Sequence, residues 1–193
     1  MNCRNELPEH YKLYKKVDLL ENKKQMILVN IVSFGLLIVF AVPGMLHRPI
    51  WLMYEGVDSV GAILLRGGCL LGGMILYMCA HELTHGIAMK YYGVEKVFYK
   101  FHGIYASASC KEYIKKGPYL VIALAPVVVW GIIFGILTLI VDDSWFWIVY
   151  MLQLVNVSGA AGDLYVSWLF RKLPEDSYFF DYGVGMEAYV VVE

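Results

Sequence analysis

Long uncharged stretches alternate with short polar segments along this chain. Residues 26–46 form one uncharged run of 21 residues, which at about 1.5 Å per residue spans a hydrocarbon core of about 30 Å. Three further apolar segments cover about 60–90, 119–141 and 145–170, and the last of them contains a single charged residue, Asp163. This pattern predicts four transmembrane helices.

The composition strengthens this prediction, because 59% of the 193 residues are hydrophobic and only 17% are charged. A soluble domain of this length must cover its surface with more polar side chains. We therefore expect the lipid bilayer as a partner. The net charge of -1 provides no basic field that would attract nucleic acid, so nucleic acid is not an expected partner.

Lysine and arginine are concentrated in the N-terminal segment, the loop 91–118 and the tail 171–193, whereas the two other connections contain only Arg48. Cytoplasmic loops retain basic residues, and four spans place all three basic segments on one side. The prediction is a multi-pass cell-membrane protein with both termini in the cytoplasm.

Short stretches with β character occur in the loop and the tail, at 97–101, 104–109 and 187–192. We expect small cytoplasmic β elements there. The predicted fold class is an all-α membrane protein, a single membrane-embedded domain over residues 1–193, with these elements attached.

The second apolar segment contains His81-Glu82-Leu-Thr-His85, an H-E-x-x-H pattern. Residues four apart lie on one helix face, so both imidazoles can bind one zinc ion with Glu82 beside them as general base. Ionisable side chains are costly inside a membrane, so three within five residues require a reason. The alternative is that this turn lies among lipid headgroups, where such residues are tolerated.

Catalytic zinc needs a third protein ligand and an open position for water. Asp163 is the best candidate, and its depth agrees. Measured from the outer end of each helix, the two histidines lie about 22 to 28 Å inward and Asp163 about 24 to 27 Å. The alternative for Asp163 is an ion pair with a basic residue near the cytoplasmic surface, such as Arg171.

Asn156, Gly159 and Asp163 are spaced i, i+3 and i+7, so they share a helix face. We predict a catalytic role for Asn156, in positioning the substrate or stabilising an oxyanion. A hydrogen bond between helices is the alternative for this side chain.

Three pieces of the chain resemble the site-2 protease group of intramembrane zinc metalloproteases and, more closely, the "putative zincin peptidase" family of small bacterial membrane proteins. They are His81 to His85, Ala123-Leu-Ala-Pro126, and Asn156 to Asp163. The resemblance implies a bacterial protein with a three-helix catalytic core and zinc on His81, His85 and Asp163. It departs from site-2 proteases at Gly159, where they carry proline, and at Gly162, which precedes the aspartate.

The expected function is that of a zinc metalloendopeptidase, which hydrolyses membrane-associated proteins or peptides with Glu82 as general base. The edge strand at 104–109 is expected to hold the unwound substrate by strand addition. Two alternatives stay open. One is a zinc-binding membrane protein with a structural, transport or regulatory role, and the other is a protease for soluble or peripheral peptides.

Overall fold

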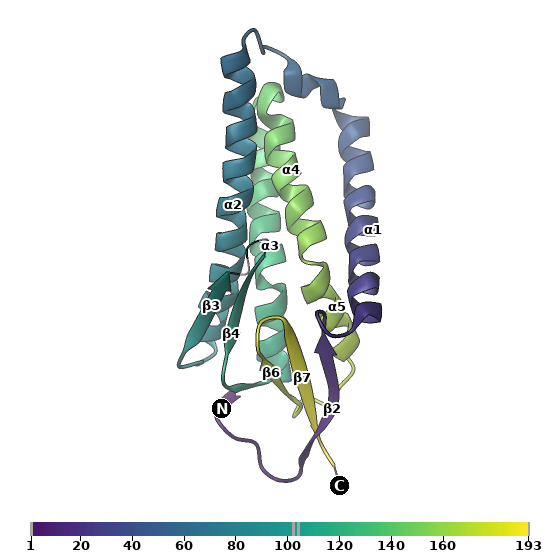
Figure 1. Cartoon of the computed structure of the whole chain (residues 1–193), viewed down its shortest axis with the longest axis vertical. Coiled ribbons are helices and arrows are strands. Elements are labelled where there is room, and N and C mark those ends of the chain that lie inside the picture. The colour runs from purple at the N-terminus through teal and green to yellow at the C-terminus, as the bar shows by residue number, and fades with distance from the viewer. Residues whose placement is uncertain (1, 102, 104, 193) are drawn as a thin grey trace.

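The computed structural model describes residues 2–101, 103 and 105–192, and its long helices run side by side along the long axis of the molecule (Figure 1). The strands gather at one end of this bundle, where both chain termini also lie. The helices are α1 (Lys23–His47), α2 (Val60–Tyr91), α3 (Lys116–Ile140), α4 (Asp143–Gly159) and α5 (Ala161–Phe170), with a short 3-10 helix at Ile50–Tyr54.

Side-chain caps mark where the first two long helices begin. The Asn22 side chain accepts hydrogen bonds from the backbone N–H groups of Lys24 and Gln25, and the Ser59 side chain accepts one from that of Ala62. These contacts satisfy N–H groups that have no partner within the first turn of a helix. The residues that determine where α1 and α2 begin are therefore adjacent to those helices in the sequence.

Among the described residues, three helices are long and apolar enough to cross a membrane, namely α1, α2 and α3. Their outer surfaces carry large exposed aliphatic side chains, such as Ile31, Leu64 and Leu139. Such surfaces are suited to lipid rather than water.

The fourth predicted span, 145–170, is divided into α4 and α5. Ala160 separates them with φ −76° and ψ 9°, which departs from α-helical geometry. Gly159 and Gly162 flank this position, and glycine lowers helix stability relative to alanine. The break allows α5 to begin just before Asp163.

The predicted all-α class is wrong, because the chain also forms two antiparallel sheets. The five-stranded sheet has the order β1-β5-β6-β7-β2, and the two-stranded sheet pairs β3 with β4. The strands are β1 (Cys3–Arg4), β2 (Tyr11–Asp18), β3 (Val97–Phe101), β4 (Ala106–Cys110), β5 (Tyr113–Lys115), β6 (Tyr178–Asp181) and β7 (Gly185–Val191). Ile104, where the second β stretch of the loop was expected to begin, lies outside the described residues.

The larger sheet exceeds the expected small elements because the N-terminal segment joins it. Strand β2 pairs with β7, whose partner residues lie more than 160 positions away in the chain. Three lysines in Tyr11–Asp18 conceal its β character, yet Val17 is buried against the sheet core. From the sequence, this segment is recognised only as a basic segment and not as a strand.

A compact core connects the sheets to the ends of the helices. It includes Met89 of α2, Ile122 of α3, Phe170 of α5 and Phe179 of β6, all buried. Since α2 also contacts β4, this core fixes the second half of α2 against both sheets. The H-E-x-x-H turn of α2 lies in that half.

Candidate active site

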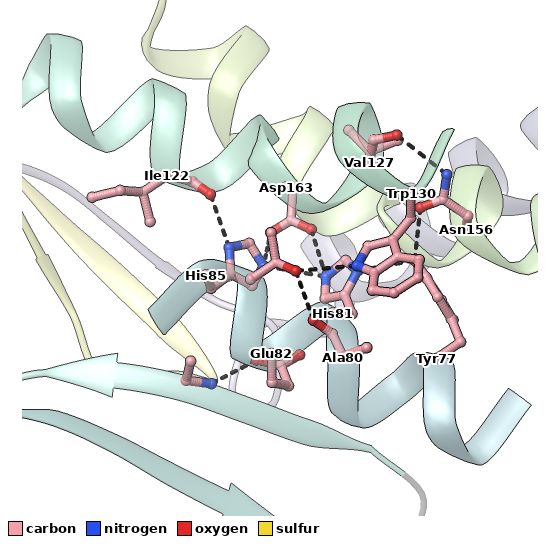
Figure 2. Close-up of polar contacts among 12 residues, drawn as sticks. Tyr77, Ala80, His81, Glu82, His85, Ile122, Val127, Trp130, Asn156 and Asp163 are labelled. Atoms are coloured by element: carbon pink, nitrogen blue, oxygen red, sulfur yellow. Dashed lines mark hydrogen bonds and ion pairs between the residues drawn. The ribbon is translucent and has the colours of Figure 1, made fainter. Parts of the chain in front are cut away.

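His81 and His85 lie one turn apart on α2, and Asp163 reaches them from the first turn of α5 (Figure 2). The Nε2 atoms of the two histidines are 3.2 Å apart. Asp163 places Oδ2 3.4 Å from Nε2 of His81 and Oδ1 3.6 Å from Nε2 of His85. The three metal ligands predicted from the sequence are thus brought together from two separate helices.

The other ring nitrogen of His85 lies 2.9 Å from the carbonyl oxygen of Ile122 on α3. A carbonyl oxygen only accepts hydrogen bonds, so Nδ1 of His85 must carry the proton and donate it. In a neutral imidazole this leaves Nε2 with a free lone pair. The contact with Ile122 therefore orients the ring and selects its tautomer.

His81 is held by a longer chain of hydrogen bonds. The Asn156 amide donates to the carbonyl oxygen of Val127 at 3.2 Å, which fixes its oxygen on the other side. That oxygen accepts from the Tyr77 hydroxyl at 2.8 Å. Tyr77 then accepts from Nδ1 of His81 at 3.0 Å, because its own proton is already donated. Nε2 of His81 is therefore also left with a free lone pair.

These assignments place two bare imidazole nitrogens and a carboxylate, all acceptors, within 3.6 Å of one another. A proton added to one ring would satisfy one contact with Asp163 but leave the other nitrogen facing the carboxylate. A cation between the three groups satisfies all of them. The arrangement is that of a site built around positive charge.

The spacing of these atoms fits zinc. A tetrahedral site with metal–ligand distances of about 2.0–2.2 Å has ligands about 3.3–3.6 Å apart. The two Nε2 atoms are 3.2 Å apart, and they lie 3.4 and 3.6 Å from the two oxygens of Asp163, so all three separations are close to that length. Two imidazoles and one carboxylate also form a ligand set found in catalytic zinc sites, with the fourth position left for water or substrate. His81, His85 and Asp163 would hold the ion.

Glu82 lies beside the three ligands but is held in a different way. Its donor oxygen lies within 4.8 Å of ring nitrogens of His81 and His85, so proximity alone would allow it to be a ligand. Its Oε2, however, accepts a hydrogen bond from the backbone N–H of Ala108 in β4 at 2.6 Å. Asp163 contacts both Nε2 atoms, so we assign the carboxylate ligand to Asp163 and leave Glu82 free to act as a base.

A cavity of about 450 Å³ opens over these groups. Its walls come from α1, α2, α3, β2, β4, the α4–α5 junction and the turn between β6 and β7. The residues that carry polar groups into it include His81, Glu82, His85, Asp163, Asn30 and Asp181. The volume is large enough for several residues of an extended peptide.

Asn156 occupies a different place from the four residues above. Its side chain is fully buried, and both ends of its amide are hydrogen-bonded, the oxygen to the Tyr77 hydroxyl and the nitrogen to the carbonyl of Val127. It reaches the site only through Tyr77 and His81. The structure therefore connects Asn156 to the metal ligands, while its predicted catalytic role stays a prediction.

Asp181 is an acidic side chain in the cavity that the sequence reading missed. It ends β6, and its Oδ1 accepts from the backbone N–H of Gly183 at 2.8 Å. Burial raises the pKa of this carboxyl to about 6. Nothing local in the tail distinguishes it from a surface aspartate, because only the pairing of β6 with β5 and β7 brings it to the cavity.

Tyr77 and Ile122 are two further residues of the site that the sequence analysis does not predict. Tyr77 lies four residues before His81, so its place on the same helix face was available from spacing alone. Ile122 acts through its backbone, which no side-chain pattern reports. It precedes the Ala123-Leu-Ala-Pro126 piece by one residue.

Comparisons with known proteins agree with this chemistry. A family model described as "Putative zincin peptidase" matches residues 74–178, more than half of the chain. The matched region includes α3 and α4 and every residue of the H-E-x-x-H turn, together with Asp163. Searches of curated proteins and of solved structures give no match. The chain belongs to the family described as "Putative zincin peptidase".

Proposed function

We propose that this chain is a membrane-embedded zinc metalloendopeptidase of the site-2 protease type, which hydrolyses membrane-associated proteins. The observation that carries the proposal is the convergence of acceptors. Two imidazoles whose outer hydrogen bonds keep Nε2 bare meet one carboxylate, with a second carboxylate beside them in an open cavity. A purely structural metal site has no need of the cavity or of Glu82.

When bound, zinc supplies a Lewis acid that polarises the scissile carbonyl and makes a water molecule more acidic. Glu82 accepts the proton of the attacking water and delivers it to the leaving amine. The backbone N–H of Ala108 donates a hydrogen bond to Oε2 of Glu82, which fixes the orientation of the carboxylate. Oε1 is then the oxygen that accepts and releases the proton. Ile122 and Tyr77 keep the two histidines in the tautomer that leaves Nε2 available.

The substrate is bound as an extended segment, because a helix hides its own peptide bonds. Strand β4 supports this step. It pairs with β3 through one edge, while the N–H of Ala108 points to Glu82 in the cavity. An unwound segment that adds to β4 along this edge would place a peptide bond beside the metal ligands.

The cytoplasmic orientation proposed from the basic segments is supported by the position of the termini. Both lie at the strand end of the bundle, beside the end of α2 that carries the H-E-x-x-H turn (Figure 1). The lysines of β2, together with Lys23 and Lys24 in the first turn of α1, lie at the same end. The site would therefore open toward the cytoplasmic surface of the membrane.

The test uses the whole chain, purified in detergent and reconstituted in liposomes. Metal content is measured by mass spectrometry, and cleavage is followed on labelled casein and on a co-reconstituted single-span membrane protein. Glu82→Gln is expected to keep one zinc per chain and lose cleavage by about 10²–10⁴-fold. Asp163→Ala is expected to lose both.

Each result separates the competing functions. Full activity or biological function in Glu82→Gln would overturn the peptidase and favour a zinc protein with a structural, transport or regulatory role. Cleavage of casein but not of the single-span protein would favour a protease for soluble peptides. Retention of zinc in Asp163→Ala would remove Asp163 from the ligand set.

A further inference from the structure

Helix α1 contributes a wall of the cavity, although it lies outside the region that the family model matches. Val29 and Asn30 line the cavity from α1, and Val17 and Leu19 line it from the segment just before that helix. In Figure 1, α1 and α2 stand on opposite sides of the bundle, with α4 and α5 between them. A substrate that fills the cavity beside the metal ligands on α2 therefore also lies beside α1.

Asn30 is an unusual residue for its position. Helix α1 is otherwise apolar over most of its length, and a polar side chain in a membrane span normally faces a partner or a functional cavity. Ser33, one turn further on, has such a partner, because its hydroxyl donates to the carbonyl oxygen of Ser158 at 2.8 Å. Within the part of the chain that the structure describes, no hydrogen bond is found for the Asn30 side chain. The residue is exposed, and it is one of those that line the cavity.

The depth of Asn30 matches that of the metal ligands. It lies seven residues from the start of α1, and His85 lies six residues from the end of α2, both ends being at the strand side of the bundle. At about 1.5 Å per residue these positions are about 10 Å and 9 Å into their helices. Asn30 and His85 are therefore similar distances from the helix ends at the strand side of the bundle, and both line the same cavity.

The cavity also has room between these walls. Gly159 lines it at the α4–α5 junction, and a Cβ added there would meet no atom within 4 Å. A chain crossing from β4 toward α1 over this glycine meets no side chain at that point. The asparagine amide carries one acceptor and one N–H₂ donor, the same pair of groups that a peptide bond displays.

We propose that Asn30 is a substrate-binding residue, whose amide hydrogen-bonds the backbone of an extended polypeptide across the cavity from β4. This inference rests on the proposed peptidase function. It assigns to the N-terminal helix a direct part in holding the substrate, in addition to the β4 edge. Because the contact is to backbone, it adds affinity and register without selecting a side chain.

The experiment measures binding of two hydroxamates to the zinc-loaded whole chain in detergent by isothermal titration calorimetry. Acetohydroxamate reaches only the metal, whereas a tripeptidyl hydroxamate extends along the cavity. Asn30→Leu keeps the size of the residue and suits a membrane helix, so it is the main variant. Asn30→Gln keeps the amide, and Ser33→Ala, one turn away, is the matched control.

Asn30→Leu is expected to lower the affinity for the tripeptidyl hydroxamate by about 5- to 20-fold, because one or two hydrogen bonds are lost. The affinity for acetohydroxamate is expected to stay unchanged. Asn30→Gln is expected to recover most of that loss, and Ser33→Ala to change neither ligand. Unchanged tripeptidyl affinity in Asn30→Leu, or in Asn30→Ala should the first variant fail to fold, overturns the proposal. Failure of acetohydroxamate to bind the zinc-loaded wild-type chain would instead overturn the peptidase site, and the role of Asn30 with it.

Discussion

Pro126 leaves the carbonyl oxygen of Ile122 without its usual helical donor, and His85 uses that oxygen. In an α-helix the N–H of residue i+4 bonds the carbonyl of residue i, but proline has no N–H to give. Pro126 lies inside α3, four residues after Ile122, whose oxygen accepts from Nδ1 of His85 at 2.9 Å. A helix defect in one span thus orients a metal ligand on another.

Replacing this proline tests the relationship. Pro126→Ala supplies an N–H that competes with His85 for the Ile122 oxygen, so the imidazole loses part of its orientation. We expect zinc affinity to fall by about 10- to 100-fold, the range typical of lost contacts behind a ligand. Competition with a fluorescent chelator measures it. Pro43→Ala, the equivalent change inside α1, is the control and should leave zinc affinity intact. Equal affinities in the two variants would refute the role of Pro126.

The hydrogen bonds behind His81 give a second prediction, which separates two roles for Asn156. If Asn156 acts by positioning Tyr77, then Tyr77→Phe and Asn156→Ala each lower zinc affinity by about 10-fold, and the double variant is no worse than either alone. Zinc titrations of the two single variants and the double variant measure this coupling. If Asn156 instead contacts the substrate, Asn156→Ala raises KM or lowers kcat while zinc affinity stays that of the wild type.

Much of the site could be predicted because its parts are encoded locally. The spacing of His81, Glu82 and His85 needs only one helical turn, and the depth argument selects Asp163 without a structure. The hydrogen bonds to Ile122 and Val127 could not be found in this way, since they use backbone atoms of another helix. The pattern of side chains along the sequence does not show directly which backbone carbonyl is available to a residue of another helix.

The fold was predicted less well, for a related reason. Apolar length identifies α1, α2 and α3 directly. Strand β2 has lysines at three of its eight positions, and its partner β7 is at the other end of the chain, so neither local pattern nor proximity marks it. The position of Asp181 depends on another long-range pairing, that of β6 with β5, whose residues lie more than 60 positions apart in the chain.

The carboxyl of Asp181 gives a prediction about pH. Burial raises its pKa to about 6, above the value of about 3.9 expected in the unfolded chain. The folded protein therefore binds the proton more tightly, and this contribution to stability is complete below about pH 4 and is lost as the pH rises through 6. Asp181→Asn removes the free-energy cost of ionising this carboxyl in the folded protein, while its amide oxygen can still accept the hydrogen bond from the N–H of Gly183.

We expect metal-free Asp181→Asn to exceed the wild type in free energy of unfolding by about 3 kcal/mol at pH 8, and to equal it near pH 4. Chemical unfolding in detergent micelles across this range measures the difference. Asp176→Asn, which changes an exposed carboxylate in the same tail, is the control. A difference that is constant with pH would show that the carboxyl does not titrate in this way.

The turn between β6 and β7 covers one side of the cavity, and its contact with β4 can be tested at Gly183. This glycine has φ +93°, and a Cβ added to it would lie 2.9 Å from the Ser107 hydroxyl oxygen and 3.1 Å from its Cβ. Gly183→Ala therefore combines backbone strain with a clash against β4. Gly93→Ala has a similar φ of +98° but meets nothing within 4 Å, so it reports strain alone.

Both variants are expected to lose about 1–2 kcal/mol from strain, and Gly183→Ala to lose more because the turn must move away from β4. Since Ala108 of β4 also holds Glu82, a displaced turn should lower kcat as well as Tm. Thermal unfolding and casein cleavage, measured on both variants, separate the two effects. Equal losses of Tm with unchanged kcat would mean that the β6–β7 turn can leave β4 without disturbing the base, and that β4 is held in place by α2 and β3 alone.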